Sequence, residues 1–196
     1  MTEQNEVYDA DFRRSLNSSA RLLRANRPGE AVAILEALHT QHPHDPDVAI
    51  NLGGALILQR KWDQAVRVLL PAARQNRQNA MLWVNLAAAQ LGRLETAGPK
   101  QQQQAITAYE QALRADPKAP NVHYHLGLIY KEQGNWSRAA ALFQRALEVN
   151  PADKDAQQWL DYLSEAIVAQ SAAHNDGAGV GRTDAAPAPP DTTEGS

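Results

Sequence analysis

Apolar residues recur along this chain at helical spacing, in short runs that turn residues separate. In residues 120–151 they mark one side of a helix in each of two runs: Val122, Leu126, Ile129 and Tyr130, then Ala139, Leu142, Phe143 and Ala146. Gly134 separates the two runs, and Pro151 follows the second, as proline does just beyond a helix. The pattern therefore predicts a pair of short helices.

The pair is repeated along the chain at a period of 34 residues. A small residue recurs at Ala31, Ala65, Ala105 and Ala139. A large apolar residue recurs at Leu35, Leu69, Tyr109 and Phe143. Both columns have spacings of 34, 40 and 34, so one six-residue insertion explains the longer step. Short helix pairs bury their apolar faces only by stacking on neighbours, which predicts an all-α repeat array.

The residues at fixed places in each unit resemble the tetratricopeptide repeat (TPR). The fit is closest in the last unit, at Leu126, Gly127, Tyr130, Gly134, Ala139, Phe143, Ala146 and Pro151. The first unit departs most, because Ser15, Ser18 and Ser19 stand where tryptophan, leucine and glycine are expected. An atypical terminal repeat is typical of a cap. The resemblance implies a right-handed α-solenoid of four TPR helix pairs plus a C-terminal capping helix.

The repeat register defines the expected domain boundaries. Residues 1–10 are an N-terminal extension, and residues 11–170 are the TPR domain. Within the domain we expect four repeats and a capping helix, over residues 12–45, 46–79, 80–119 with the insertion, 120–153, and 153–169. Residues 171–196 are rich in Ala, Gly and Pro, have a net charge of −3 and contain no aromatic residue. This composition predicts a disordered acidic tail, because it offers little apolar surface to bury.

Two local features depart from a regular repeat. The insertion lies between Gly92 and Ala105, and Pro99 is placed to begin the helix that follows. It is either a tolerated surface insertion or a dedicated partner contact. Pro71 falls inside the second helix of the second repeat. Since proline removes one helical hydrogen bond, we expect a bend there and not a helix end.

Composition and charge exclude several classes of function. The chain has no cysteine, which excludes disulfides, thiolate metal sites and a cysteine nucleophile. Its net charge of −3 gives no basic footprint for nucleic acid. No apolar run is long enough to span a membrane, and the acidic N-terminus does not resemble a signal peptide. We therefore expect no nucleic acid or membrane partner and a cytoplasmic location.

No set of residues supports catalysis or metal binding. The glycines form no phosphate-binding loop, and no nucleophile elbow or zinc-binding helix motif occurs. His39, His42 and His44 precede Asp45 in the first inter-repeat turn, where a solvated loop is favoured over a metal site. We expect no enzyme activity, no catalytic residue, no metal and no cofactor.

The resemblance places a ligand groove on the first helix of each repeat. A polar row then runs through Asn17, Asn51, Asn85 and His125. An apolar row runs through Leu16, Ile50, Val84 and Tyr124, with Leu128 nearby. The amides are similar to the asparagine ladder of the O-GlcNAc transferase repeats and imply binding to a peptide backbone. The alternative is that these asparagines stabilise repeat packing.

The predicted function is non-catalytic protein–protein interaction: a scaffold that binds a partner peptide segment in the concave TPR groove. The groove lacks the lysines and arginines with which related repeats clamp the carboxylate of chaperone tails, so that role is rejected. The alternative function is a structural subunit that self-associates, as a homo-oligomer, or docks through its terminal helices in a larger complex. Trp159 and Tyr162 in the capping helix would form a docking patch if they were exposed together.

Overall fold

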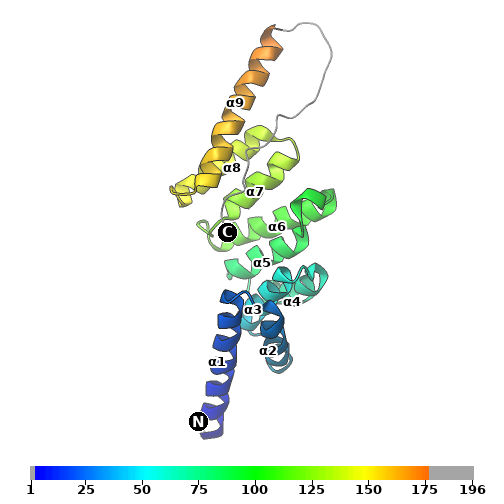
Figure 1. Ribbon diagram of the computed structural model, residues 1–196, viewed down its shortest axis with the longest axis vertical. Coiled ribbons are helices and arrows are strands. Elements are labelled where there is room, and N and C mark those ends of the chain that lie inside the picture. The colour runs from blue at the N-terminus through cyan, green and yellow to red at the C-terminus, as the bar shows by residue number, and fades with distance from the viewer. Residues whose placement is uncertain (1–2, 177–196) are drawn as a thin grey trace. The chain divides into compact units, whose positions relative to one another are not determined.

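The computed structural model of the protein describes the backbone of residues 3–176 and the side chains of residues 10–170. In this part of the chain the regular elements are all helical (Figure 1). Contacts divide the chain into two compact units, Met1–Ala119 (unit 1) and Pro120–Ser196 (unit 2). The all-α repeat architecture predicted from the periodicity is confirmed.

Unit 1 contains three helix pairs. Its elements are α1 (Glu3–Arg24), α2 (Pro28–Gln41), α3 (Pro46–Leu58), α4 (Trp62–Gln75), α5 (Ala80–Leu91), the 3-10 turn η1 (Leu94–Thr96) and α6 (Pro99–Ala115). Each helix packs on the next along the chain, and the first helices of successive pairs also contact one another, α1 with α3 and α3 with α5. The first helices therefore lie side by side, as stacked repeats require.

The repeating columns of the sequence form the core of unit 1. Ala31, Ala65 and Ala105 are fully buried, and so is Leu69 of the large apolar column. A small residue at this place lets the two helices of a pair approach closely, and the large residue fills the space beside it. The period of the sequence is thus the period of the core.

Caps and prolines set the helix boundaries. The Asp45 carboxylate accepts hydrogen bonds from the backbone N–H groups of Asp47 and Val48, at 3.0 and 2.9 Å, and so caps α3. Asp45 therefore has a structural role in the histidine-rich turn. The insertion contributes the start of α6, which begins at Pro99 as predicted. Helix α4 runs through Pro71 without ending there, as expected, whereas the bend remains a prediction.

Unit 2 contains α7 (Val122–Glu132), α8 (Trp136–Val149) and α9 (Lys154–Asp176), with α8 packed between the other two. Trp159 of α9 is only 6% exposed. Its ring stacks on Phe143 with centroids 6.3 Å apart, and the Lys131 ammonium lies 4.3 Å from its centroid. Trp159 therefore belongs to the packing of unit 2. Because Trp159 is buried, it and Tyr162 are not exposed together, so the condition for a docking patch is not met.

The first and last helices are longer than the repeat register predicted. Helix α1 begins at Glu3, so the expected N-terminal extension is largely helical. Helix α9 continues to Asp176, so the expected tail from residue 171 begins with six helical residues. The remainder of that tail, residues 177–196, lies outside the described residues. The periodic apolar pattern locates the part of a helix that packs on neighbouring helices. It does not show where a helix ends when the helix continues past the last residue of the pattern.

The described helices include none that is both long enough and apolar enough to cross a lipid bilayer.

Candidate functional site

The predicted groove residues of unit 1 lie on three neighbouring helices. We call this surface the predicted groove face; it comprises Leu16, Asn17 and Ala20 of α1, Ile50, Asn51 and Gly54 of α3, and Val84, Asn85 and Ala88 of α5. The contacts of α1 with α3 and of α3 with α5 bring these positions together. Sequence positions 34 residues apart therefore become neighbours in space.

Two adjacent glycines show which way this face points. A Cβ atom added to Gly53 would lie 2.5–2.7 Å from the side-chain carbons of Leu69, so this side of α3 packs directly on α4. A Cβ atom added to Gly54 would meet nothing within 4 Å. Consecutive helical residues are about 100° apart around the axis. The predicted groove face is therefore open at Gly54, on the side away from α4.

The predicted groove face is mainly apolar and incompletely covered. Leu16, Ile50 and Val84 are each half-buried. Leu58, at the end of α3, is 56% exposed, and Met81, in the first turn of α5, is 47% exposed. Among the described side chains, only Leu58, Met81 and Val168 are large, apolar and exposed. Two of these three thus adjoin the face that the repeat register assigns to ligand.

The three asparagines of this face have different surroundings. Asn17 is exposed. The Asn51 amide donates a hydrogen bond to the Asp47 carbonyl, one turn earlier in α3, at 2.8 Å. The Asn85 amide donates to the Ile50 carbonyl at 3.3 Å and so connects α5 to α3. Asn85 therefore stabilises the packing of one repeat on the next. The amides of Asn51 and Asn85 each keep a side-chain carbonyl and a second N–H with which they can form further hydrogen bonds.

The corresponding residues of unit 2 line a hollow. Tyr124 and His125 of α7, together with Asn121 before it, face the turn between α8 and α9. They enclose a volume of about 490 Å³ with residues of that turn: Asn150, Ala152, Asp153, Lys154 and Asp155. Leu128, one turn further along α7, is half-buried. The sequence indicated the α7 side of this hollow, but the turn residues were missed because only folding brings α9 back to α7.

Two titratable groups of this hollow, Tyr124 and His125, have shifted pKa values. Burial raises the pKa of Tyr124, and the nearby Asp155 carboxylate raises it further. Burial lowers the pKa of His125, because desolvation disfavours the imidazolium. Both groups are therefore neutral at pH 7 and act as hydrogen-bonding and aromatic surface. Among the side chains that the structure describes, no cluster of histidines and carboxylates is placed to hold a metal ion.

A second hollow, of about 640 Å³, lies in unit 1 at the turn between α4 and α5. It is lined by the end of α4, the start of α5, the mostly polar residues 75–80 that include the turn, and Asp116 just after α6. None of the predicted groove residues takes part in it. The signal that could have indicated it is Arg77, which replaces the proline that closes the other repeats.

Comparison with protein families gives three matches along the chain. Models described as tetratricopeptide repeats match residues 22–91 and 120–153, and a model described as a TPR repeat matches residues 100–134. Together they include both helices of most of the predicted repeats.

Comparison with characterised proteins gives partial matches to larger chains. The chain is 31% identical to the cellulose synthase operon protein C of Pseudomonas fluorescens (strain SBW25), over 73% of this chain and 13% of that protein. It is 33% identical to the cytochrome c-type biogenesis protein CycH of Rhizobium meliloti (strain 1021), over 57% of this chain and 26% of that protein. The chain thus corresponds to about a quarter or less of either relative.

Solved structures share the fold. A thermophilic TPR protein of Thermus thermophilus superposes with a TM-score of 0.68 and 18% identity, over 85% of this chain and 91% of that chain. MamA of Desulfovibrio magneticus RS-1 superposes with a TM-score of 0.66 and 22% identity, over 84% of this chain and 89% of that chain. At this level of identity the similarity concerns the fold alone.

Proposed function

The chain belongs to the tetratricopeptide repeat family, and we propose that it is a non-catalytic scaffold that holds a segment of a partner protein on the predicted groove face of unit 1. The TPR fold is an interaction scaffold, and stacked helix pairs offer an extended surface to a ligand. The proposal concerns where this chain binds and by which side chains.

The observation that carries the proposal is the uncovered apolar surface of unit 1. Leu58 and Met81 are about half exposed, at opposite ends of their helices, and the aliphatic row between them is half-buried. Covering such side chains with apolar groups of a partner releases water and favours binding by roughly 25 cal/mol per Å² of apolar area. The partner segment therefore carries apolar side chains, and its binding depends weakly on salt.

The asparagines supply the directional contacts in this proposal. Asn17 and Asn51 pair with peptide groups of the bound segment, whatever its side chains are. Asn85 contributes its carbonyl oxygen, because its N–H is engaged with Ile50 of α3. In unit 2, Tyr124, His125 and Leu128 offer a further contact surface, with aromatic and polar groups around the hollow.

Gly54 offers a variant that blocks the face without disturbing the core. Arginine at Gly54 projects into open space, because no atom lies within 4 Å of the added Cβ. We expect Gly54→Arg to abolish partner capture and Gly54→Ala, the matched control, to retain it. Gly54→Arg is a cleaner test than Asn85→Ala, because Asn85 also connects α5 to α3.

Capture is measured by photo-crosslinking in native lysate, with a photoreactive residue in place of Met81. The same residue in place of Gln103, which is exposed on α6, serves as the control position. We expect a specific adduct from position 81 that is absent from position 103, disappears with Gly54→Arg and persists at high salt. An adduct that survives Gly54→Arg, or that forms equally at position 103, rules out the predicted groove face as the binding site.

A further inference from the structure

Helix α4 and its flanking turns form a strongly basic segment in an acidic chain. Residues 60–77 contain one carboxylate, Asp63, against five cations: Arg60, Lys61, Arg67, Arg74 and Arg77. Their net charge is +4, whereas the whole chain has −3, so the remaining residues sum to −7. The predicted groove face lies on the first helices of the pairs, and α4 is a second helix. This concentration of positive charge therefore plays no part in the predicted groove face.

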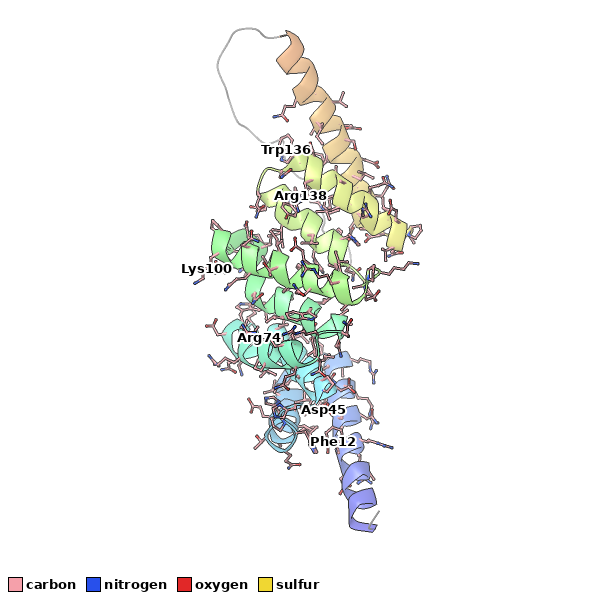
Figure 2. The ribbon with its side chains drawn as sticks, turned by 180° about the vertical axis from the view of Figure 1, so that it is seen from behind. Phe12, Asp45, Arg74, Lys100, Trp136 and Arg138 are labelled. Atoms are coloured by element: carbon pink, nitrogen blue, oxygen red, sulfur yellow. The ribbon has the colours of Figure 1, made fainter. Side chains whose placement is uncertain are left out.

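All five cations of this segment are exposed. The ion pairs found among the described side chains include none of them. Arg67 and Arg74 are seven residues apart, so they lie on the same side of α4, separated by about 10.5 Å along its axis. Pro71, which is also exposed, lies between them and carries no charge. Figure 2 labels Arg74 on this helix.

Arg77 continues the positive surface beyond the end of α4. Its Nε–H donates a hydrogen bond to the backbone carbonyl of Arg74 at 3.4 Å, so its guanidinium lies against the last turn of the helix. Arg77 also lines the hollow of about 640 Å³ between α4 and α5, where the other polar side chains are amides and the Asp116 carboxylate. We call the surface of Arg67, Arg74 and Arg77 the basic side of α4.

We propose that the basic side of α4 binds an acidic, extended segment of a partner protein. Each residue of an extended chain advances about 3.3 Å, so carboxylates three residues apart match the distance of about 10.5 Å between Arg67 and Arg74. Arginine pairs with a carboxylate through two parallel hydrogen bonds, which fixes orientation as well as adding energy. A single exposed ion pair contributes little, so the segment needs carboxylates for all three arginines. The amides around the hollow then bond to its peptide groups.

A short acidic peptide fits this surface better than a nucleic acid does. Single strands bind by stacking their bases on aromatic side chains, and the large apolar side chains exposed in the described part of the chain are Leu58, Met81 and Val168, none of them aromatic. A duplex extends its charge well past the patch, where the remaining net charge of −7 repels it. Asp63, one turn before Arg67, already limits the positive surface at the start of α4.

Binding of a synthetic acidic peptide tests the proposal with the full chain. The probe is a fluorescent peptide with glutamate at every third residue, and its binding is followed by fluorescence anisotropy. At about 0.15 M salt, exposed charges more than roughly 8 Å apart are largely screened, so direct contacts dominate. We expect the unchanged chain to bind this peptide and not the same peptide with glutamine in place of glutamate. Arg67→Glu combined with Arg74→Glu is expected to weaken binding about tenfold or more, since like charges then meet.

A matched control reverses two cations outside the basic side of α4. Lys100→Glu with Arg114→Glu makes the same change in net charge on exposed positions of α6 and is expected to leave the affinity unchanged. Circular dichroism of each variant verifies that the helices are intact. The proposal is overturned if the unchanged chain does not bind the glutamate peptide, if the α4 and α6 variants bind it equally, or if a DNA duplex binds more tightly than the peptide.

The basic side of α4 and the predicted groove face are tested independently. Gly54→Arg blocks the predicted groove face and is expected to bind the glutamate peptide like the unchanged chain. Loss of peptide binding in Gly54→Arg would place the peptide on the predicted groove face and overturn the assignment to α4.

Discussion

Alanine substitution at the two adjacent glycines of α3 is expected to change the stability of unit 1 in opposite directions. At Gly54 the added methyl group meets no atom within 4 Å, so only the backbone effect remains. Glycine in a helix interior is less favourable than alanine by roughly 0.5–1 kcal/mol, because the unfolded chain loses more freedom. Gly54→Ala should therefore raise the free energy of unfolding by about that amount.

At Gly53 the same backbone gain is outweighed by a clash. The added methyl carbon would lie 2.5 Å from Leu69 Cγ, and Leu69 is fully buried, so its side chain has little room to move. Overpacking a core in this way costs about 1–3 kcal/mol. Less the gain from the backbone, Gly53→Ala should lower the free energy of unfolding by up to about 2.5 kcal/mol.

Urea denaturation followed by circular dichroism measures both changes. The substitutions are adjacent in one helix of unit 1, so they report on the same transition, and the unchanged chain is the reference. Gly127 provides an independent repetition in unit 2, because its added Cβ would lie 2.9 Å from Phe143 Cε1. A Gly53→Ala variant as stable as Gly54→Ala would refute the assignment of Gly53 to the core side of α3 and of Gly54 to the open side.

Three further predictions use the same denaturation assay. Asn85→Ala should lower the free energy of unfolding by about 0.5–1.5 kcal/mol, because it removes the hydrogen bond from α5 to the Ile50 carbonyl. An unchanged free energy of unfolding would mean that this hydrogen bond does not stabilise the fold. Pro71→Ala should stabilise the chain by about 1–3 kcal/mol, since alanine restores the missing helical N–H, and an unchanged midpoint would contradict this. Burial lowers the pKa of His125 below 6.5, so its contribution to stability is present above pH 6.5 and is lost as the pH falls through the lowered pKa. With His125→Asn, the free energy of unfolding should fall less steeply between pH 7.5 and pH 5 than it does in the unchanged chain. An equally steep fall would show that His125 is not the source of this pH dependence.

The repeat period alone predicted most of the fold. A residue that must fit between two helices has the same requirement in every repeat, which is why the alanine column and the large apolar column were visible in the sequence. The same reasoning located the start of α6 at Pro99. It did not predict the full lengths of α1 and α9, since the repeat pattern does not extend into their outer turns.

The candidate site was predictable in its positions but not in its contacts. The register assigned Asn17, Asn51 and Asn85 to one row, as if they were equivalent. The structure shows Asn17 exposed, Asn51 bonded within α3 and Asn85 bonded across to α3. Trp159 likewise had the apolar character of a docking residue, but it is covered by Phe143 and Lys131.

The sequence by itself determined the all-α repeat architecture, the residues of the core and the helices that carry the predicted groove face, because these follow from a pattern that recurs every 34 residues. Only the tertiary structure decided which glycine faces Leu69 and which is open, and which turn residues join Tyr124 around the hollow in unit 2. Local periodicity specifies which side of a helix is apolar. The distance between side chains far apart in the sequence depends on how the helices pack, so it is decided only when they fold together.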